Sequence, residues 1–483
     1  MNRKMIVYIL SRVLLVEAAL MAPSLVCGLI YREGEVLAFV PPIVLAAALG
    51  ALMMRRKPTD TTIYAREGFC VVAAAWIMLS VIGALPLCLC GRGLSAWDCF
   101  FEIVSGFTST GATILGNVEA LPKCILFWRS FTHWIGGMGV LVFVLAIVPL
   151  EDNRSLHLMR AEVPGPVVGK LVPRMRETAK ILYGVYSVMT VILVGLLLLG
   201  GMPLFDSLCH AFGAAGTGGF SVKNAGIMYY DSRYLEMVLA VFMLLFGVNF
   251  NLFYLIMLGR MRAALKDEEL RWYFAIVAAA VLMIAVNTFR LYGTVGQSLR
   301  YAFFQVSSII TTTGYATADY ANQWPQFSQH VLVLLMIIGA CAGSTGGGLK
   351  VSRVMILLRS FSSEVRRLIH PRMVSVIRIN GKAVADETIQ GVRVYFAIYM
   401  LIVCASTLLL SLDNFDFATN LTAELACFNN IGPGIGLVGP MGNFGIYSPL
   451  SKMLLSFNML LGRLEIYPLL VLLSPGVWRR AAA

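Results

Sequence analysis

The chain has 483 residues, of which 58% are hydrophobic and only 13% are charged, whereas about 25% of the residues of a soluble domain are charged. This composition excludes a soluble enzyme and a disordered chain. The net charge is +12, but a mean hydropathy of +0.79 also excludes a nucleic-acid-binding protein. The chain is therefore predicted to be a polytopic membrane protein.

Ten apolar segments are long enough to cross a bilayer, which takes about 20 helical residues. The first segment follows basic residues, as in a signal peptide, but it has no small-residue cleavage site, so we expect a retained helix. In chain order the segments cover residues 5–30, 36–54, 68–90, 128–150, 181–202, 235–259, 272–291, 328–358, 393–412 and 450–474.

Lysine and arginine are concentrated in alternate connections between these segments. With the N-terminus inside, the cytoplasmic segments hold 27 of the 38 basic residues and the outside segments hold nine. The positive-inside rule therefore predicts that both termini are cytoplasmic. The outside segments carry more acids than bases, which predicts a weakly cation-attracting outer face.

Four of the outside connections contain an apolar stretch that is too short to span the membrane and that ends in a glycine-bearing turn. Each of them lies between two full spans, so the chain repeats the order helix, short helix, helix four times. The four turns align on glycines spaced by 107, 96 and 118 residues, namely Gly111, Gly218, Gly314 and Gly432.

Non-helical backbone at membrane depth survives only where it is buried in protein or lines water, so the four turns indicate a shared central cavity. The predicted fold is an all-α polytopic membrane protein. It has four helix / re-entrant pore helix / helix repeats around a pseudo-fourfold pore, plus two N-terminal transmembrane helices. The expected units are residues 1–64 for the two N-terminal helices, then 65–152, 153–262, 263–370 and 371–483 for the pore repeats.

Carbonyl oxygens from four turns around one axis can replace the hydration shell of a cation. Glycine suits such turns because it has no Cβ, and the C-terminal ends of the short helices favour positive charge. A single Thr-Gly is ordinary loop punctuation, but four in register favour a selectivity filter. The predicted coordinating residues are Thr110, Gly111, Thr217, Gly218, Thr313, Gly314, Ile431 and Gly432.

The strings around these turns resemble the TrkH type of the Trk/Ktr/HKT superfamily of potassium transporters, and the resemblance covers essentially the whole chain. It implies potassium uptake across the plasma membrane, which is the inner membrane in bacteria, with K⁺ as the transported ion, no cofactor and no enzymatic activity. It also implies a homodimer and a cytosolic nucleotide-binding regulatory protein of the TrkA type. The strings are residues 109–113, 127–130, 136–139, 342–348, 370–372 and 428–434.

The predicted filter departs from that of potassium channels in the residues that follow the four glycines. Only the third turn has the Gly-Tyr pair of a channel. We therefore expect potassium to be preferred over sodium less sharply than in a channel, with rubidium tolerated. The four residues are Ala112, Gly219, Tyr315 and Pro433.

The eighth apolar segment is interrupted by a glycine-rich stretch, residues 339–350. Each glycine costs a helix about 1 kcal/mol relative to alanine, so this stretch is not expected to be helical. It is not a phosphate-binding loop either, because it lacks the Gly-Lys-Ser/Thr ending and a preceding strand. The resemblance implies an intramembrane gating loop over 339–349, with Gly343, Gly346, Gly347 and Gly348 as gating residues.

Arg463 lies near the middle of the last apolar segment. An unpaired cation there costs about 3 kcal/mol or more, so the side chain should face protein or water. Glu465 is two positions away and so lies on a different helix face. The resemblance implies that Arg463 projects into the pore below the filter; a purely structural ion pair is the alternative.

The long cytoplasmic segment after residue 350 contains Asn380-Gly381 between two β-prone runs, which predicts a hairpin. Several arginines flank it. This basic face is expected to dock the regulatory protein or to contact anionic lipid of the bilayer. The arginines are Arg359, Arg366, Arg367 and Arg372.

Two other classes of protein remain as alternatives. An intramembrane enzyme would need His133 or His210 as a base, but no catalytic motif accompanies either of them. A proton- or sodium-coupled carrier of another solute is closer in class, although four filter-like turns argue against it. The sequence does not decide whether transport is passive or coupled to symport of a second ion.

Overall fold

The computed structural model describes residues 2–55, 58, 64–139, 175–373 and 375–475. These residues are almost entirely helical, and the strands among them are β1 (Arg378–Ile379) and β2 (Lys382–Ala383). The strands pair antiparallel through Arg378↔Ala383 and Ile379↔Lys382. Asn380 and Gly381 both have positive φ, as a two-residue hairpin turn requires. The predicted hairpin is therefore confirmed.

Six of the ten predicted spans are single stretches of helix long and apolar enough to cross a membrane. Each is predominantly apolar, and its helical hydrogen bonds satisfy most backbone groups within the segment, as a bilayer requires. They are α1 (Arg3–Tyr31), the 3₁₀ turn η1 (Gly34–Phe39) with α2 (Val40–Met54), α3 (Ala65–Leu89), α8 (Met175–Leu199), α13 (Glu268–Tyr292) and α18 (Asp386–Leu410).

The fourth and eighth predicted spans are shorter as helices than the apolar segments. The fourth begins as α5 (Lys123–Gly137), and its expected continuation to residue 150 lies outside the described residues, as does most of the connection over 154–180. The eighth is interrupted as predicted, because α16 (Gln326–Ile338) and α17 (Val351–Ile369) are separated by irregular chain.

Two spans predicted to be continuous are broken, so those predictions are wrong. Residues 235–259 form α10 (Arg233–Phe246) and α11 (Phe250–Met257), bent by 93°. Residues 450–474 form α20 (Pro449–Arg463) and α21 (Tyr467–Leu473), bent by 119°. The physical reason lies in the backbone, which bonds to a distant part of the chain at the first break and adopts a left-handed conformation at the second.

At the first break, the Phe250 N–H donates to the Gly343 carbonyl at 3.0 Å, and the Gly247 carbonyl accepts from the Cys341 N–H at 3.1 Å. The glycine-rich stretch thus supplies the partners that helix continuation would have supplied. At the second break, Glu465 and Ile466 have φ of 53° and 69°. That left-handed conformation ends a helix and is unusual for a β-branched residue.

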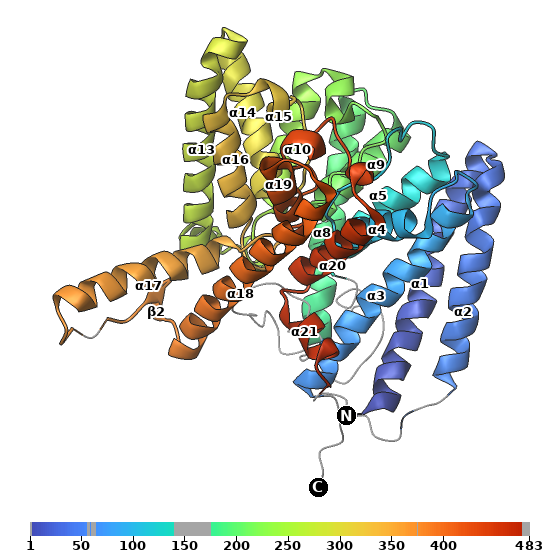
Figure 1. Ribbon diagram of the computed structural model, residues 1–483, viewed down its shortest axis with the longest axis horizontal. Helices are drawn as coiled ribbons and strands as arrows, with labels where there is room; N and C mark the ends of the chain where they lie inside the picture. Colours follow the sequence, from blue (N-terminus) through green and yellow to red (C-terminus); the bar gives the residue numbers. More distant parts are fainter. Residues whose placement is uncertain (1, 56–57, 59–63, 140–174, 374, 476–483) are drawn as a thin grey trace.

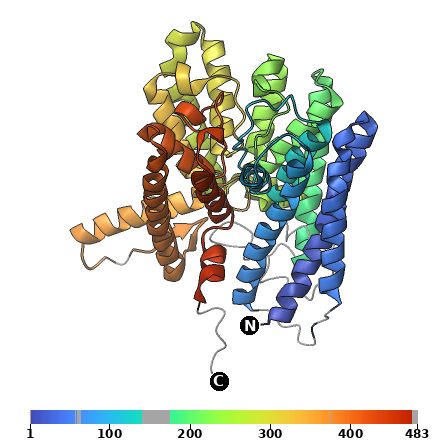
Figure 2. The ribbon, with the colours of Figure 1, turned by 45° about the vertical axis from the view of Figure 1, so that its right-hand side comes forward.

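Four short helices are inserted between the long ones, as the predicted fold requires. They are α4 (Ala96–Phe107), α9 (Leu204–Gly216), α14 (Val295–Ile310) and α19 (Phe417–Phe428). Figures 1 and 2 show them among the longer helices, whereas α17 extends sideways from the bundle. The remaining elements are η2 (Gly226–Tyr230), α12 (Met261–Leu265), α15 (Tyr320–Gln323), η3 (Ser411–Asp413), η4 (Gly436–Val438) and η5 (Phe444–Ile446).

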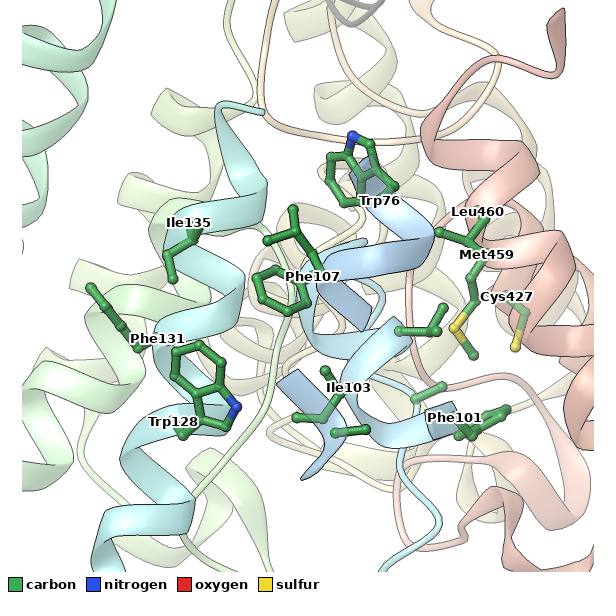
Figure 3. Close-up of a cluster of buried hydrophobic side chains, with 14 of the residues drawn as sticks. Trp76, Phe101, Ile103, Phe107, Trp128, Phe131, Ile135, Cys427, Met459 and Leu460 are labelled. Atoms are coloured by element: carbon green, nitrogen blue, oxygen red, sulfur yellow. The ribbon is translucent and has the colours of Figure 1, made fainter. Parts of the chain in front are cut away.

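Large buried side chains hold the first short helix in place (Figure 3). The ring of Phe107 on α4 meets the ring of Trp128 on α5 edge to face, with centroids 5.9 Å apart. The Trp128 indole N–H in turn donates to the Gly83 carbonyl on α3 at 2.9 Å. Aromatic contacts of this kind add about 0.5–1.5 kcal/mol to the stabilisation from buried area. The end of α4 is therefore fixed by two neighbouring spans.

Candidate ion-conduction pathway

The turns that follow the four short helices share one backbone pattern. In each, a residue with φ between 56° and 59° is followed, two positions later, by a glycine with φ between 74° and 100°. Each also repeats a pair of helix-ending hydrogen bonds, such as Ser109 N–H to Gly106 O and Thr110 N–H to Ser105 O. The glycines in this pattern are Gly111, Gly219, Gly314 and Gly432.

This pattern corrects the predicted alignment of the second turn by one residue. The residue with left-handed φ there is Thr217, which makes it equivalent to Ser109 and makes Gly218 equivalent to Thr110. Three consecutive positions, 217 to 219, are Thr-Gly-Gly, so the sequence offers two glycines for one structural role. The residue that follows the structural glycine is therefore Phe220 and not Gly219.

The four turns close into a ring. A Cβ added to Gly111 would lie 1.7 Å from the carbonyl oxygen of Gly218, and one added to Gly219 would lie 2.1 Å from that of Thr313. The contacts continue from Gly314 to the Ile431 oxygen at 2.0 Å and from Gly432 to the Thr110 oxygen at 2.8 Å. Each glycine thus faces the carbonyl before the glycine of the next turn.

Four backbone carbonyls are consequently brought together by units far apart in the chain. They belong to Thr110, Gly218, Thr313 and Ile431, all four of which are among the predicted coordinating residues. No side chain larger than hydrogen fits at the glycines, because a Cβ closer than 3.0 Å to backbone forces the ring apart. This close approach explains why glycine stands at each position.

The outer side of the ring opens into a cavity of about 150 Å³. All four structural glycines line it, together with the four residues that follow them and with Lys223 and Asn443. In the part of the chain that the structure describes, no group of three or more His, Cys, Asp or Glu residues is placed to hold a metal ion.

Buried ion pairs, which the sequence analysis missed, anchor the short helices. Glu102 on α4 accepts from the Arg129 Nε at 2.9 Å, and both side chains are fully buried. The other Glu102 oxygen accepts from the Ile114 N–H at 3.0 Å, which fixes the chain leaving the first turn. A similar pair, Glu236 with Arg300 at 2.6 Å, anchors α14. The sequence feature that could have revealed these ion pairs is a charged residue in an otherwise apolar segment.

The glycine-rich stretch, residues 339–350, lies directly beneath the third and fourth turns. The Gly347 N–H donates to the Thr312 hydroxyl at 2.6 Å, and a Cβ on Gly347 would lie 2.1 Å from the Asn429 carbonyl oxygen. The Lys350 ammonium donates to the Gly346 carbonyl. Of the predicted gating residues, Gly347 thus contacts the ring units directly.

The ends of this stretch touch each other. A Cβ on Gly348 would lie 2.7 Å from the Gly339 Cα, and the Lys350 N–H donates to the Ile338 carbonyl at 2.9 Å. Residues 340–347 therefore form an excursion from two adjoining ends. Gly343, another predicted gating residue, lies within that excursion and accepts from Phe250.

A single carboxylate from α13 bonds to both sides of the excursion. Glu269 Oε1 accepts from the Ala342 N–H at 2.8 Å and from the Ser352 N–H at 3.0 Å. The hairpin tip lies beside this point, because the Asn380 side-chain oxygen accepts from the Glu268 N–H at 2.7 Å. This link between the hairpin and the glycine-rich stretch was not predicted from the sequence.

Arg463 lies at the end of α20 and bonds to the excursion and to α5. Its guanidinium donates to the Thr345 carbonyl at 2.9 Å and to the carbonyls of Gly136 and Gly137 at 2.5 Å. Glu465 lies in the break between α20 and α21, and not on another face of the same helix as predicted, and it pairs with Arg353 at 2.5 Å. Arg463 therefore joins the excursion of the third repeat to the first repeat, below the ring.

The two histidines considered for catalysis have packing and hydrogen-bonding roles. His133 on α5 lies between the first and second turns, and His210 on α9 bonds to the Asp206 carbonyl at 2.8 Å and to the Ser221 hydroxyl at 3.1 Å. His133 bonds to backbone groups, and the ring nitrogen of His210 that faces away from Ser221 bonds to a backbone carbonyl and not to a carboxylate, so neither histidine forms a Ser-His-Asp arrangement among the described residues.

A ring of four re-entrant turns inside a bundle of apolar spans defines a pore-forming membrane protein of the transporter class. A family model described as a cation transport protein, TrkH, matches residues 38–478. The chain belongs to the TrkH family.

Relatives match over nearly their full length. The Trk system potassium uptake protein TrkH of Salmonella typhimurium is 37% identical over 475 residues, which are 97% of each chain. The potassium uptake protein TrkG of Escherichia coli K12 is 35% identical and covers 95% of each chain. The crystal structure of the potassium transporter TrkH from Vibrio parahaemolyticus superposes with a TM-score of 0.89 at 33% identity, covering 99% of this chain and 100% of that one.

Proposed function

We propose that this protein takes up potassium ions through the ring formed by the four turns. The single observation that carries the proposal is the closed contact of each glycine with the next turn's carbonyl, which brings four backbone oxygens together at one level. Oxygens so placed can replace the hydration shell of a cation. The names of the relatives, which are potassium uptake proteins, support potassium as the ion.

The glycine-rich stretch is the gate of this pathway. Support comes from its position beneath the third and fourth turns and from its lack of regular structure, which lets it move without unwinding a helix. Its bonds to Arg463 and to Glu269 are contacts that opening would have to break or move. The gating residues proposed are Gly343, Gly346, Gly347, Gly348 and Arg463.

A cytosolic nucleotide-binding protein of the TrkA type acts on the hairpin, in a homodimer with both termini cytoplasmic in the plasma membrane. The hairpin is a suitable contact point because its tip bonds to α13 one residue before Glu269, which holds the gate. Arg359 is engaged internally with Glu268 at 2.7 Å. The exposed Arg366, Arg367 and Arg372 therefore remain for the regulator or for anionic lipid.

Potassium uptake is tested by expression in bacteria that lack their own potassium uptake systems. We expect growth to be restored at low potassium, and purified protein in liposomes to take up radioactive rubidium. Excess potassium should block rubidium uptake, whereas choline should not, because only a small dehydrated cation fits between carbonyls. Well-expressed protein that neither restores growth nor takes up rubidium would refute the proposal. Uptake that requires a proton or sodium gradient would identify coupled transport.

Replacing Arg463 by Ala is expected to raise potassium flux several-fold. A fixed positive charge about 4 Å from the ion path opposes a cation by about 4 kcal/mol at an effective dielectric constant of about 20, and nearby carbonyls offset part of this. Loss of the side chain also frees the gate from α5. Flux per folded molecule and thermal stability should be measured together.

Arg300→Ala is the control, since it breaks a partly buried ion pair with Glu236 on other helices than those of the gate. The control should lose stability without a gain in flux. If Arg463→Ala behaves like the control, Arg463 has a purely structural role.

A further inference from the structure

The second turn of the ring has the smallest side chains of the four turns. Its residues 216–219 are Gly-Thr-Gly-Gly, and glycine loses more conformational entropy on ordering than any other residue. The Thr217 hydroxyl bonds only to the carbonyl of its neighbour Gly216, at 2.6 Å. A turn of this composition needs partners from outside itself to keep its carbonyls at a fixed position.

One such partner is the imidazole of His133. The Phe220 N–H donates to Nε2 at 3.3 Å, so Nε2 is an acceptor, and Nδ1 carries the proton that is donated to the Gly106 carbonyl at 2.8 Å. The ring also lies against Gly218, where a Cβ would be 2.3 Å from Nδ1. His133 thus joins the end of α4 in the first repeat to the backbone of the second turn.

The other partner is the hydroxyl of Tyr315, which comes from the third turn. It lies 3.2 Å from the Phe220 carbonyl oxygen and 3.1 Å from the His210 carbonyl oxygen, and it is fully buried. Gly213 makes room for it, because a Cβ there would be 2.2 Å from the hydroxyl oxygen. The N–H and the carbonyl of Phe220 are therefore both held, from opposite neighbours in the ring.

We infer that His133 and Tyr315 are positioning residues that determine ion specificity by holding the second turn at Phe220. Phe220 directly follows Gly219, so its two peptide groups fix the chain that carries the Gly218 carbonyl. Discrimination between ions of different size needs oxygens that stay at a set separation. This inference rests on the proposed function, because it assigns the specificity of that same ring.

The test compares Tyr315→Phe and His133→Asn with the parent protein in liposomes, with the sodium concentration that halves rubidium uptake as the measure of selectivity. Tyr315→Phe keeps the ring and removes only the hydroxyl. The loss of one buried hydrogen bond is expected to lower potassium-over-sodium selectivity about fivefold, with flux per folded molecule changed less than about twofold. His133→Asn should lower selectivity as well, since it leaves the Phe220 N–H unpaired.

Tyr183→Phe is the matched control, because the Tyr183 hydroxyl also donates to a backbone carbonyl, that of Gly139 at 2.9 Å, but away from the second turn. Its selectivity should equal that of the parent protein. Unchanged selectivity in both test variants, even with lowered thermal stability, would overturn the inference and leave these residues a structural role. A parent protein that does not itself prefer potassium would refute the proposed function, an outcome that the parent measurement alone reveals.

Discussion

Gly314→Ser is expected to lower the preference for potassium over sodium by about an order of magnitude, which corresponds to about 1.4 kcal/mol. Gly314 has φ of 85°, a conformation that L side chains rarely adopt, and a Cβ there would lie 2.0 Å from the Ile431 carbonyl oxygen. Both atoms belong to backbone, so the contact cannot be relieved by rotating a side chain. The third and fourth turns must separate, and one ring oxygen moves out of line.

The measurement is the ratio of potassium to sodium permeability in liposomes, which does not depend on the amount of folded protein. Gly296→Ser, on the short helix α14 that precedes this turn, is the control, since a Cβ at Gly296 meets nothing within 4 Å. An unchanged ratio for Gly314→Ser would mean that the ring is not the selectivity filter.

Deleting residues 340–347 is expected to raise flux about tenfold or more while the potassium-to-sodium ratio stays at the parent value. The deletion joins Gly339 to Gly348, whose backbones already touch, so the new peptide bond spans a gap that one trans peptide of about 3.8 Å covers. It removes the contacts of the excursion with Thr312, with Asn429 and with Arg463. The ring above retains its own bonds.

Flux should be expressed per folded molecule, and the permeability ratio serves as the internal control. Low flux together with a loss of the preference for potassium over sodium would place the excursion in the filter. Unchanged flux would show that the excursion does not close the pathway.

The sequence predicted those parts of the fold that depend on local composition. Apolar length identified the spans, and the glycine content of residues 339–350 identified their interruption. The break after Gly247 was not predictable because its cause is distant, and the break after Arg463 was not predictable because its left-handed residues, Glu465 and Ile466, are not of the types that favour this conformation. The Gly247 carbonyl accepts a hydrogen bond from the Cys341 N–H, and the Phe250 N–H donates to the Gly343 carbonyl. These distant partners are known only from the folded chain.

The ring was likewise predicted only in those features that depend on local sequence. Spacing located all four turns, but only the left-handed φ of Thr217 shows that Gly219 is the structural equivalent of Gly111. Adjacent glycines are indistinguishable in sequence, since the difference lies in what each one faces: Gly218 faces His133, and Gly219 faces the Thr313 carbonyl.

The closed contact of four turns within one chain has a consequence for how ion preference can evolve. In a pore made of four identical subunits, one codon change alters every quarter of the ring at once. Here each turn is encoded separately, so a substitution beside Gly219 leaves the residues in contact at Gly314 and Ile431, and at Gly432 and Thr110, unchanged. Mutations can therefore change the ion preference through one turn of the ring at a time.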